Sequence, residues 1–308
     1  MSTKDWTLLL TLALIWSGPF LFIEFALEGL SPFTIVALRV ALGAAALHGA
    51  MRVAKLRLPR DARAWRDFAI MGLLNNALPF CLIVNAQTEI TSGLTSIFNA
   101  TTPIFTVVLA HYLTHDERFT PAKVFGIAAG VAGVIAMIGP DALEGLGANI
   151  MAQLAVCGAS CSYALAGIFG RRFKGRPAMV PATGSLVCAA LVMVPLALIV
   201  DRPWALPMPG PGVWASVLAL ALLCTALAYI LYFKILASAG ATNLMLVTLL
   251  IPPGAVVLGA IFLGESLAWR EVAGMALIGI GLLAIDGRAF KWFARGRRAS
   301  PSSRSGSR

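Results

Sequence analysis

The segments "HDERFTPAKVFGIAAGVAGVIAMIG" (115–139) and "LGESLAWREVAGMALIGIGLLAIDG" (263–287) decide the fold of this chain. They align without gaps at an offset of 148 residues, and each places a loop glutamate before a glycine-rich apolar span. Their identical pairs include Gly126 with Gly274 and Gly133 with Gly281. The chain therefore contains an internal repeat, which limits the architectures that it can adopt.

The composition is that of an integral membrane protein. Hydrophobic residues make up 59% of the chain, charged residues make up 12%, and the mean hydropathy is +0.85. A soluble domain has about twice that share of charged residues. Apolar runs long enough to cross a bilayer as helices occur at 6–26, 32–51, 67–86, 92–112, 121–138, 149–170, 178–200, 212–234, 241–263 and 270–287.

Five spans fall in each half of the chain, and this odd number sets the relation between the halves. The second repeat must enter the membrane with the opposite orientation, as in many secondary transporters. The sequence therefore predicts an all-α integral membrane protein with ten transmembrane helices in two inverted five-helix repeats. The repeats are expected at 1–140 and 141–287, followed by a basic, disordered cytoplasmic tail at 288–308.

The net charge of +10 is distributed as a topology signal. If the N-terminus is cytoplasmic, nearly all Lys and Arg residues lie on the cytoplasmic side, with Arg202 and Arg270 outside and Arg39 within a span. This pattern favours membrane lipids as partners and argues against nucleic acid. We expect both termini in the cytoplasm of a bacterium, the chain in its inner membrane, and a monomer or a homodimer.

Three segments carry a resemblance to a known family. They are "LALIWSGPF", "LSPFTIVALRVALGA" and "TTPIFTVVLAHYL" continuing into the first repeat segment. With them, the chain from Trp6 to Gly287 resembles the EamA-type members of the drug/metabolite transporter superfamily. The resemblance implies a central cavity lined by spans 1, 3, 4, 6, 8 and 9, with spans 5 and 10 packed behind.

Prolines interrupt the fourth and ninth spans. Pro103 cannot donate to the carbonyl of Asn99, and Pro252 and Pro253 leave two further carbonyls free in the second repeat. Interruptions at matching places in two repeats point to a substrate site, although a kink satisfied by neighbouring threonines is the alternative. We predict that these three prolines are hinges of the transport cycle.

Polar and aromatic side chains at mid-membrane depth complete the predicted site. Such residues are costly in lipid and should face protein or a watery cavity, although an aromatic alone is more often core. Amides, hydroxyls and aromatic rings together suit a zwitterionic or mildly polar solute. The predicted substrate-binding residues are Trp16, Ser17, Asn75, Asn76, Phe80, Asn99, Thr102, Ser160, Tyr163, Thr225, Tyr229 and Thr248.

Arg39 is the basic residue inside a span, about 10 Å deep at the rise of a helix. Glu24, near the outer end of the first span, is its predicted charge partner. Arg39 would either extend outward to tie down helix ends or attract an anionic group of the substrate.

The predicted function is secondary transport of a small polar or zwitterionic metabolite, an amino acid or a related compound, by alternating access and toward export. A multidrug or nucleotide-sugar-like carrier is the alternative, and a membrane-embedded enzyme is disfavoured because no catalytic motif surrounds His48, His111 or His115. No cofactor, metal site or catalytic residue is expected. The sequence leaves the substrate, the direction of transport and any coupling ion open.

Overall fold

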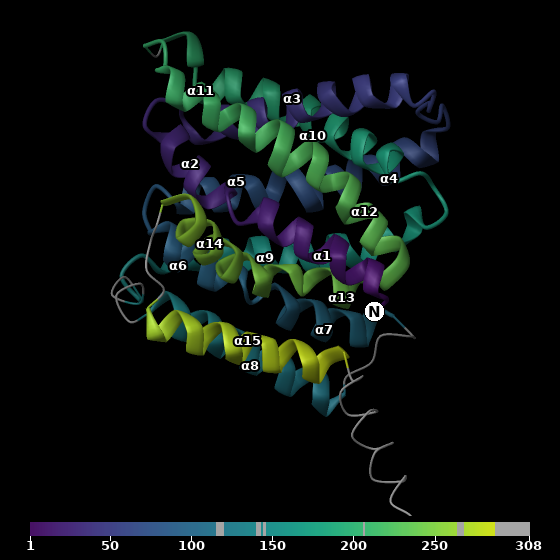
Figure 1. Cartoon of the computed structure of the whole chain (residues 1–308). Helices are drawn as coiled ribbons and strands as arrows, with labels where there is room; N and C mark the ends of the chain where they lie inside the picture. The colour runs from purple at the N-terminus through teal and green to yellow at the C-terminus, as the bar shows by residue number, and fades with distance from the viewer. Residues whose placement is uncertain (115–119, 140–142, 144–145, 206, 264–267, 287–308) are drawn as a thin grey trace, which may run out of the picture.

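The chain is a bundle of helices, and the computed structural model describes residues 1–114, 120–139, 143, 146–205, 207–263 and 268–286 (Figure 1). The predicted boundary at residue 140 and the predicted tail at 288–308 lie outside these residues. Spans 1 to 5 of the first half are α1 (Thr3–Trp16) with α2 (Pro19–Leu27); α3 (Pro32–Val53); α4 (Ala62–Gly72), η1 (Leu73–Ala77) and α5 (Leu78–Ala86); α6 (Ser92–Asn99) with α7 (Thr102–Leu113); and α8 (Pro121–Ile138).

The second half repeats this order of spans. Spans 6 to 10 are α9 (Ile150–Gly170); α10 (Met179–Val200); α11 (Pro211–Leu218), η5 (Ala219–Leu227) and α12 (Ala228–Ala239); α13 (Ala241–Met245) with α14 (Val247–Leu263); and α15 (Trp269–Asp286). Short 3₁₀ turns, η3 (Arg171–Phe173) and η4 (Pro203–Ala205), lie between spans. Within the described residues, eight of these segments are long and apolar enough to cross a membrane, and α13–α14 and α15 hold the ninth and tenth places.

The span ends follow from local sequence. Pro32, Pro121 and Pro211 begin their helices, where the missing N–H costs no hydrogen bond. At the start of α1, the Ser2 hydroxyl accepts from the backbone N–H of Asp5, and the Asp5 carboxylate accepts from the backbone N–H of Ser2. This capping box satisfies backbone donors that the first turn leaves free.

Corresponding spans of the two halves pack on each other. Helix α3 packs along α10, and α8 packs along α15, so the second span meets the seventh and the fifth meets the tenth. Figure 1 shows α8 and α15 side by side at the lower edge of the bundle. This is the position that the resemblance implied for spans 5 and 10.

The α8–α15 contact confirms the inverted repeat. A Cβ atom added to Gly126 would lie 2.4 Å from the carbonyl oxygen of Gly281, and one added to Gly133 would lie 2.7 Å from that of Gly274. Gly126 therefore contacts the repeat mate of Gly133, and Gly133 contacts the repeat mate of Gly126. Such reciprocal contacts are what a two-fold relation produces. The small-residue faces thus bring helices together within the chain.

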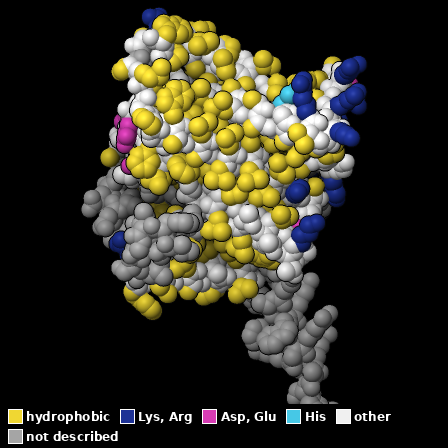
Figure 2. Space-filling view, turned by 45° about the horizontal axis from the view of Figure 1, so that its top comes forward, with side chains coloured by type: hydrophobic (Ala, Val, Ile, Leu, Met, Phe, Trp, Pro, Cys, Tyr) yellow, Lys and Arg dark blue, Asp and Glu magenta, His cyan; other side chains and the backbone are white. Residues whose placement is uncertain are grey.

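The surface separates into an apolar band and a charged end. Hydrophobic side chains cover much of the wall of the bundle, and most Lys and Arg side chains in view gather at one end (Figure 2). We call this the basic end. It contains the start of α1, the loop from α3 to α4, η3 and the end of α12. The start of α1 and the end of α15 lie at the same end, as an even number of crossings requires (Figure 1).

Candidate functional site

A cavity lies in the centre of the bundle. Its walls come from spans 1, 3, 4, 6, 8 and 9, which are the spans that the resemblance implied, and from one residue of span 2. Most of the lining is aliphatic or aromatic, with a few polar groups among the rings. The lining residues are Trp16, Pro19, Phe20, Ile23, Arg39, Asn75, Phe80, Ile83, Val84, Asn99, Tyr163, Tyr229, Tyr232, Met245, Thr248 and Ile251.

Arg39 reaches this cavity from α3 and is 5% exposed. Its Nε donates to the Thr225 hydroxyl at 2.8 Å, and its guanidinium carbon lies 3.7 Å from the centre of the Phe80 ring. A cation over an aromatic ring is stabilised by the quadrupole of the ring. The side chain therefore turns inward, and the prediction that it extends toward the membrane surface is wrong.

The predicted charge pair of Arg39 with Glu24 is also wrong. Glu24 is exposed on α2, whereas the Arg39 side chain is buried and held by Thr225 and Phe80. The depth of both residues could be predicted from the spans, but the direction of their side chains around the helix axis could not. A difference of one residue turns a helical side chain by 100°, so matching depth does not ensure contact.

Span 3 contains a π-helical segment beside the cavity, η1 (Leu73–Ala77). The hydroxyl of Tyr229 bonds to the Asn75 carbonyl oxygen at 3.1 Å and to the side-chain oxygen of Asn76. The Ser162 hydroxyl donates to the Leu74 carbonyl at 2.7 Å. A π-helix misaligns the ordinary i to i−4 ladder, and here side chains from spans 6 and 8 bond to its carbonyls.

Span 8 contains the matching π-helical segment, η5 (Ala219–Leu227). The indole Nε1 of Trp16 donates to the Cys224 carbonyl at 3.0 Å. Cys224 is the repeat mate of Asn75 in the alignment of Phe80 with Tyr229, so equivalent carbonyls of the two halves each accept from an aromatic side chain. Both aromatic donors also line the cavity, and π-helical turns are frequent at functional sites.

The interruption of span 4 is present as predicted, but its free carbonyl is capped. Helix α6 ends at Asn99 and α7 begins at Thr102, with Pro103 in its first turn. The Thr102 hydroxyl donates to the Asn99 carbonyl at 2.6 Å, and the Ser160 hydroxyl donates to the Phe98 carbonyl at 3.2 Å. The alternative of a kink satisfied by neighbouring hydroxyls is therefore the correct one for the backbone.

The interruption of span 9 lies elsewhere than predicted. Helix α14 runs through Pro252 and Pro253, and the break falls at Leu246, between α13 and α14. The Thr248 hydroxyl caps this break by donating to the Met245 carbonyl at 2.9 Å. Proline in a helix removes a hydrogen bond but does not always end the helix, since neighbouring helices and hydroxyls compensate in membranes.

Three buried polar atoms at or next to the cavity have no hydrogen-bond partner among the described residues. They are the side-chain oxygen of Asn99, the hydroxyl of Tyr232 and the side-chain nitrogen of Asn76. Asn99 and Tyr232 line the cavity itself. A buried polar atom without a partner costs free energy, so these atoms are where a bound polar solute would gain most.

The cavity brings together seven of the twelve predicted substrate-binding residues, which are Trp16, Asn75, Phe80, Asn99, Tyr163, Tyr229 and Thr248. The other five act behind the lining through the hydrogen bonds that Ser17, Asn76, Thr102, Ser160 and Thr225 form. The Ser17 hydroxyl, for example, lies 2.8 Å from the Ile251 carbonyl oxygen and joins α1 to α14.

Sequence reasoning missed Tyr232, which is 1% exposed and packs against Trp16 at a ring separation of 6.1 Å. Its spacing could have revealed it. Tyr229 and Tyr232 are three residues apart and therefore lie on the same side of a helix. The aliphatic lining residues had no such signal, because they resemble any other apolar residue of a membrane span.

Two inverted five-helix repeats around a central cavity define a multi-pass membrane transporter. The EamA-like transporter family matches this chain at residues 6–139 and 150–285, and the chain belongs to that family.

Curated relatives match over most of their length. A "Probable amino-acid metabolite efflux pump" of Escherichia coli is 26% identical, over 92% of this chain and 94% of that protein. A "Probable terminal-alkyne amino-acid exporter" of Streptantibioticus cattleyicolor is 26% identical over 99% of both chains. The "Uncharacterized transporter YoaV" of Bacillus subtilis is 22% identical, over 89% of this chain and 94% of that protein.

A solved crystal structure has the same fold. It superposes with a TM-score of 0.77 at 20% sequence identity, covering 95% of this chain and 99% of that one. At this identity the likeness shows the fold alone.

Proposed function

We propose that this transporter exports an amino acid or a closely related zwitterionic metabolite by alternating access. The observation that carries the proposal is the buried guanidinium of Arg39 in the central cavity. Its neighbours there, Thr225 and Phe80, are neutral. A buried cation without an anion is costly inside a membrane, and a substrate carboxylate would supply that anion.

The donors of Arg39 suit a carboxylate. Nε is occupied by Thr225, which leaves the two terminal nitrogens to form a bidentate pair with both carboxylate oxygens. The side-chain oxygen of Asn99, which lacks a partner among the described residues, can accept from a substrate ammonium group. The rings of Trp16 and Tyr232 would enclose the apolar part of the solute.

The cavity argues against the alternative cargoes. A lipophilic cation would bring its positive charge toward Arg39, which costs free energy at close range. A nucleotide sugar carries two phosphate charges, and Arg39 is the one cation among the described lining residues. The names of two relatives, an amino-acid metabolite efflux pump and an amino-acid exporter, agree with this choice.

We place the transporter in the inner membrane of a bacterium, with the basic end and both termini in the cytoplasm. The clustering of Lys and Arg at that end supports this orientation. Export then means that the cavity receives its solute at the basic end and releases it at the opposite end.

Counterflow in proteoliposomes tests the proposal. Vesicles preloaded with one unlabelled amino acid would be screened for uptake of the same labelled compound, with its methyl ester and a lipophilic amine as controls. We expect uptake of at least one amino acid and rejection of its methyl ester, which lacks the carboxylate. Equal uptake of acid and ester would contradict the role of Arg39, and uptake of the lipophilic amine alone would favour a multidrug carrier.

A further inference from the structure

Helix α3 ends in a strained cap at the basic end of the bundle. The N–H of Leu56 donates to the Met51 carbonyl at 2.9 Å, and the N–H of Lys55 donates to the Arg52 carbonyl at 3.1 Å. This pair of bonds is the Schellman motif, in which one residue takes a left-handed conformation and is usually glycine. Here that residue is Lys55, with φ at 55°. A residue with a Cβ atom is strained in this conformation, so the lysine calls for an explanation.

The second repeat has the same feature at the equivalent place. Among the described residues, Arg202 is the other non-glycine residue with a positive φ, at 48°. Lys55 lies two residues after the end of α3, and Arg202 lies two residues after the end of α10, the corresponding helix. Both halves therefore place a long basic side chain where glycine would fit better.

Two general rules explain cations at the end of α3 but not this backbone. Basic residues at a helix C-terminus complement its dipole, and basic loops set the topology. Arg52 and Arg57 satisfy both rules without a positive φ. Neither rule therefore requires a cation in the left-handed position.

Lys55 lines a cleft that the last turns of α3 form with the segment after the helix. The floor of this cleft is apolar, with Met51, Leu56 and Leu58 among its lining residues. Its basic side chains are exposed, and they form no side-chain hydrogen bond or ion pair with any residue that the structure describes. They are His48, Arg52, Lys55 and Arg57. Their donors are thus open to a group from outside the chain.

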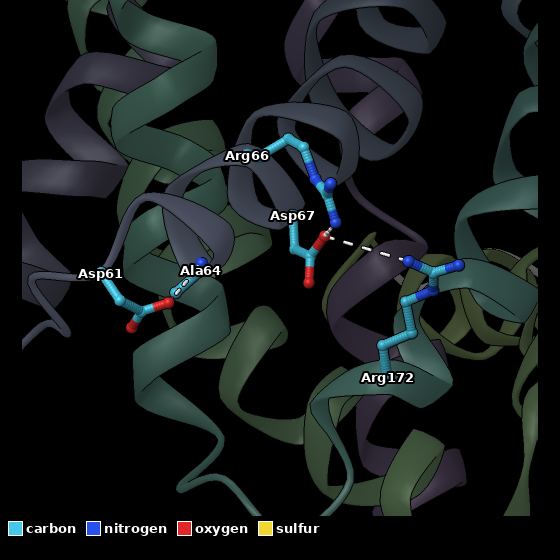
Figure 3. Close-up of polar contacts among 5 residues, drawn as sticks. All are labelled: Asp61, Ala64, Arg66, Asp67 and Arg172. Carbon is cyan, nitrogen blue, oxygen red and sulfur yellow. Dashed lines mark hydrogen bonds and ion pairs between the residues drawn. The ribbon is translucent and has the colours of Figure 1, made fainter.

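The two acidic residues that follow this cleft in the sequence are engaged elsewhere. The Asp61 carboxylate accepts from the backbone N–H of Ala64 at 2.8 Å and caps α4. Asp67 lies 3.3 Å from Arg66 and 3.9 Å from Arg172, and Figure 3 shows it between these two guanidinium groups. Neither carboxylate lines the cleft.

The outer face of α3 leads from the cleft along the wall of the bundle. Ala45, Gly49 and Val53 are four residues apart and exposed, so they form one face of the helix. A Cβ atom added to Gly49 would have no neighbour within 4 Å, and Val53 is 86% exposed. Figure 1 shows α3 at the upper edge of the bundle. In a bilayer this apolar face meets acyl chains, so the cleft lies where the headgroup of the same lipid would be.

We propose that the cleft binds the headgroup of an anionic phospholipid, with Lys55 and Arg52 on its phosphate and the acyl chains along α3. Basic side chains at a membrane surface attract anionic headgroups, and the arginine fork matches phosphate oxygens. A soluble anion would gain nothing from the apolar face. The strain at Lys55 is retained because its side chain is needed for binding. This site does not depend on which solute the central cavity carries.

The experiment is native mass spectrometry of the purified full chain in an uncharged detergent, which counts the lipids bound. The lipid probe is phosphatidylglycerol, and phosphatidylcholine with the same acyl chains is its neutral reference. Glycerol 3-phosphate, added as a competitor, is the soluble probe. The first site variant is Lys55→Gly. Its matched control is Arg202→Gly, which relieves the same kind of strain and removes the same charge outside the cleft.

A second pair of variants leaves the strained backbone as it is. Arg52→Gln removes a charge from the cleft, and Arg60→Gln removes one from an exposed residue of the same loop, outside the cleft. We expect each site variant to bind phosphatidylglycerol about fivefold more weakly, the effect of losing one basic side chain at an anionic surface. Both controls should bind it as the wild type does.

The melting temperature separates binding from capping. Without lipid, Lys55→Gly should melt at or above the wild-type temperature, because glycine relieves the left-handed strain, and yet it should lose lipid affinity. The proposal is overturned if the site variants bind like the wild type, if the controls lose as much affinity as they do, or if phosphatidylglycerol binds no better than phosphatidylcholine. Displacement of the lipid by an equal concentration of glycerol 3-phosphate would assign the cleft to a soluble anion instead.

Discussion

The π-helical segments of spans 3 and 8 occupy equivalent places in the two halves but differ in the side chains that they bind. In each half, an aromatic side chain from another span bonds to the equivalent carbonyl, which is Asn75 for Tyr229 and Cys224 for Trp16. The next residue differs, because Asn76 bonds to the Tyr229 hydroxyl while its mate Thr225 accepts from Arg39.

This difference makes the polar groups of the cavity asymmetric between the halves. Arg39, Asn75 and Asn99 come from the first half, and the second half supplies the Thr225 hydroxyl that accepts from Arg39. A symmetric scaffold with an asymmetric lining can bind a solute whose two ends differ, such as a zwitterion. The repeat thus places a π-helical segment in each half, and under the proposed function single side chains select the solute.

The largest effect should come from disturbing the feature that both halves share, the close glycine contact of α8 with α15. Gly126→Ala would place a Cβ atom 2.4 Å from the carbonyl oxygen of Gly281, and the backbones would have to separate. We expect a loss of about 2 to 3 kcal/mol in stability, which thermal unfolding in detergent would measure. Gly279→Ala is the matched control, because its added Cβ has no neighbour within 4 Å. Equal melting temperatures for both variants would contradict the close contact.

A smaller difference should separate the two aromatic donors. Tyr229→Phe keeps the ring but removes the bonds to Asn75 and Asn76, whereas Trp16→Phe removes the bond to the Cys224 carbonyl. We expect Tyr229→Phe to cost about 1 to 2 kcal/mol through two unpartnered acceptors. Trp16→Phe should lose a similar amount of stability, because its ring is smaller and the Cys224 carbonyl loses its donor. It should alter substrate affinity more than Tyr229→Phe does. Thermal unfolding would measure the loss of stability, and counterflow would measure the change in substrate affinity. An unchanged melting temperature and affinity for Tyr229→Phe would show that its hydrogen bonds contribute to neither.

The smallest effects should come from the prolines. Pro103 lies in the first turn of α7, where its missing N–H matters little, whereas Pro252 lies inside α14. Replacing Pro252 with Ala restores a backbone bond and should slow transport at near-normal substrate affinity, as expected for a hinge. Pro103→Ala should slow transport less. Wild-type transport rates for both variants would contradict the hinge prediction.

Much of this fold could be predicted from hydropathy, because a bilayer requires long apolar helices. The odd number of spans in each half predicted the inversion that the α8–α15 contact confirms. The π-helical segments could not be foreseen, since an extra residue per turn leaves no mark in composition, and neither η1 nor η5 contains proline or glycine. The break at Leu246 lacked a signal for the same reason, whereas the prolines drew attention to a continuous helix.

For the candidate site, the sequence predicted how deep each residue lies in the membrane but not which way its side chain points. Asn75, Asn99 and Tyr229 were found because polar groups at mid-membrane depth must face protein or water. The Glu24–Arg39 pair failed because side-chain direction depends on how each helix is rotated in the bundle. That rotation is set by packing between spans, which one sequence does not reveal.

The most direct test of the central claim is the counterflow rate of Arg39→Gln in proteoliposomes, measured with an amino acid that the wild type carries. Arg60→Gln, an exposed arginine of a basic loop, is the control for loss of charge. The account predicts that Arg39→Gln inserts normally, loses more than about thirtyfold in rate, corresponding to roughly 2 kcal/mol for a lost charge pair, and no longer distinguishes the amino acid from its methyl ester. Wild-type flux and retained discrimination in Arg39→Gln would contradict it, and would leave Arg39 with a structural role alone.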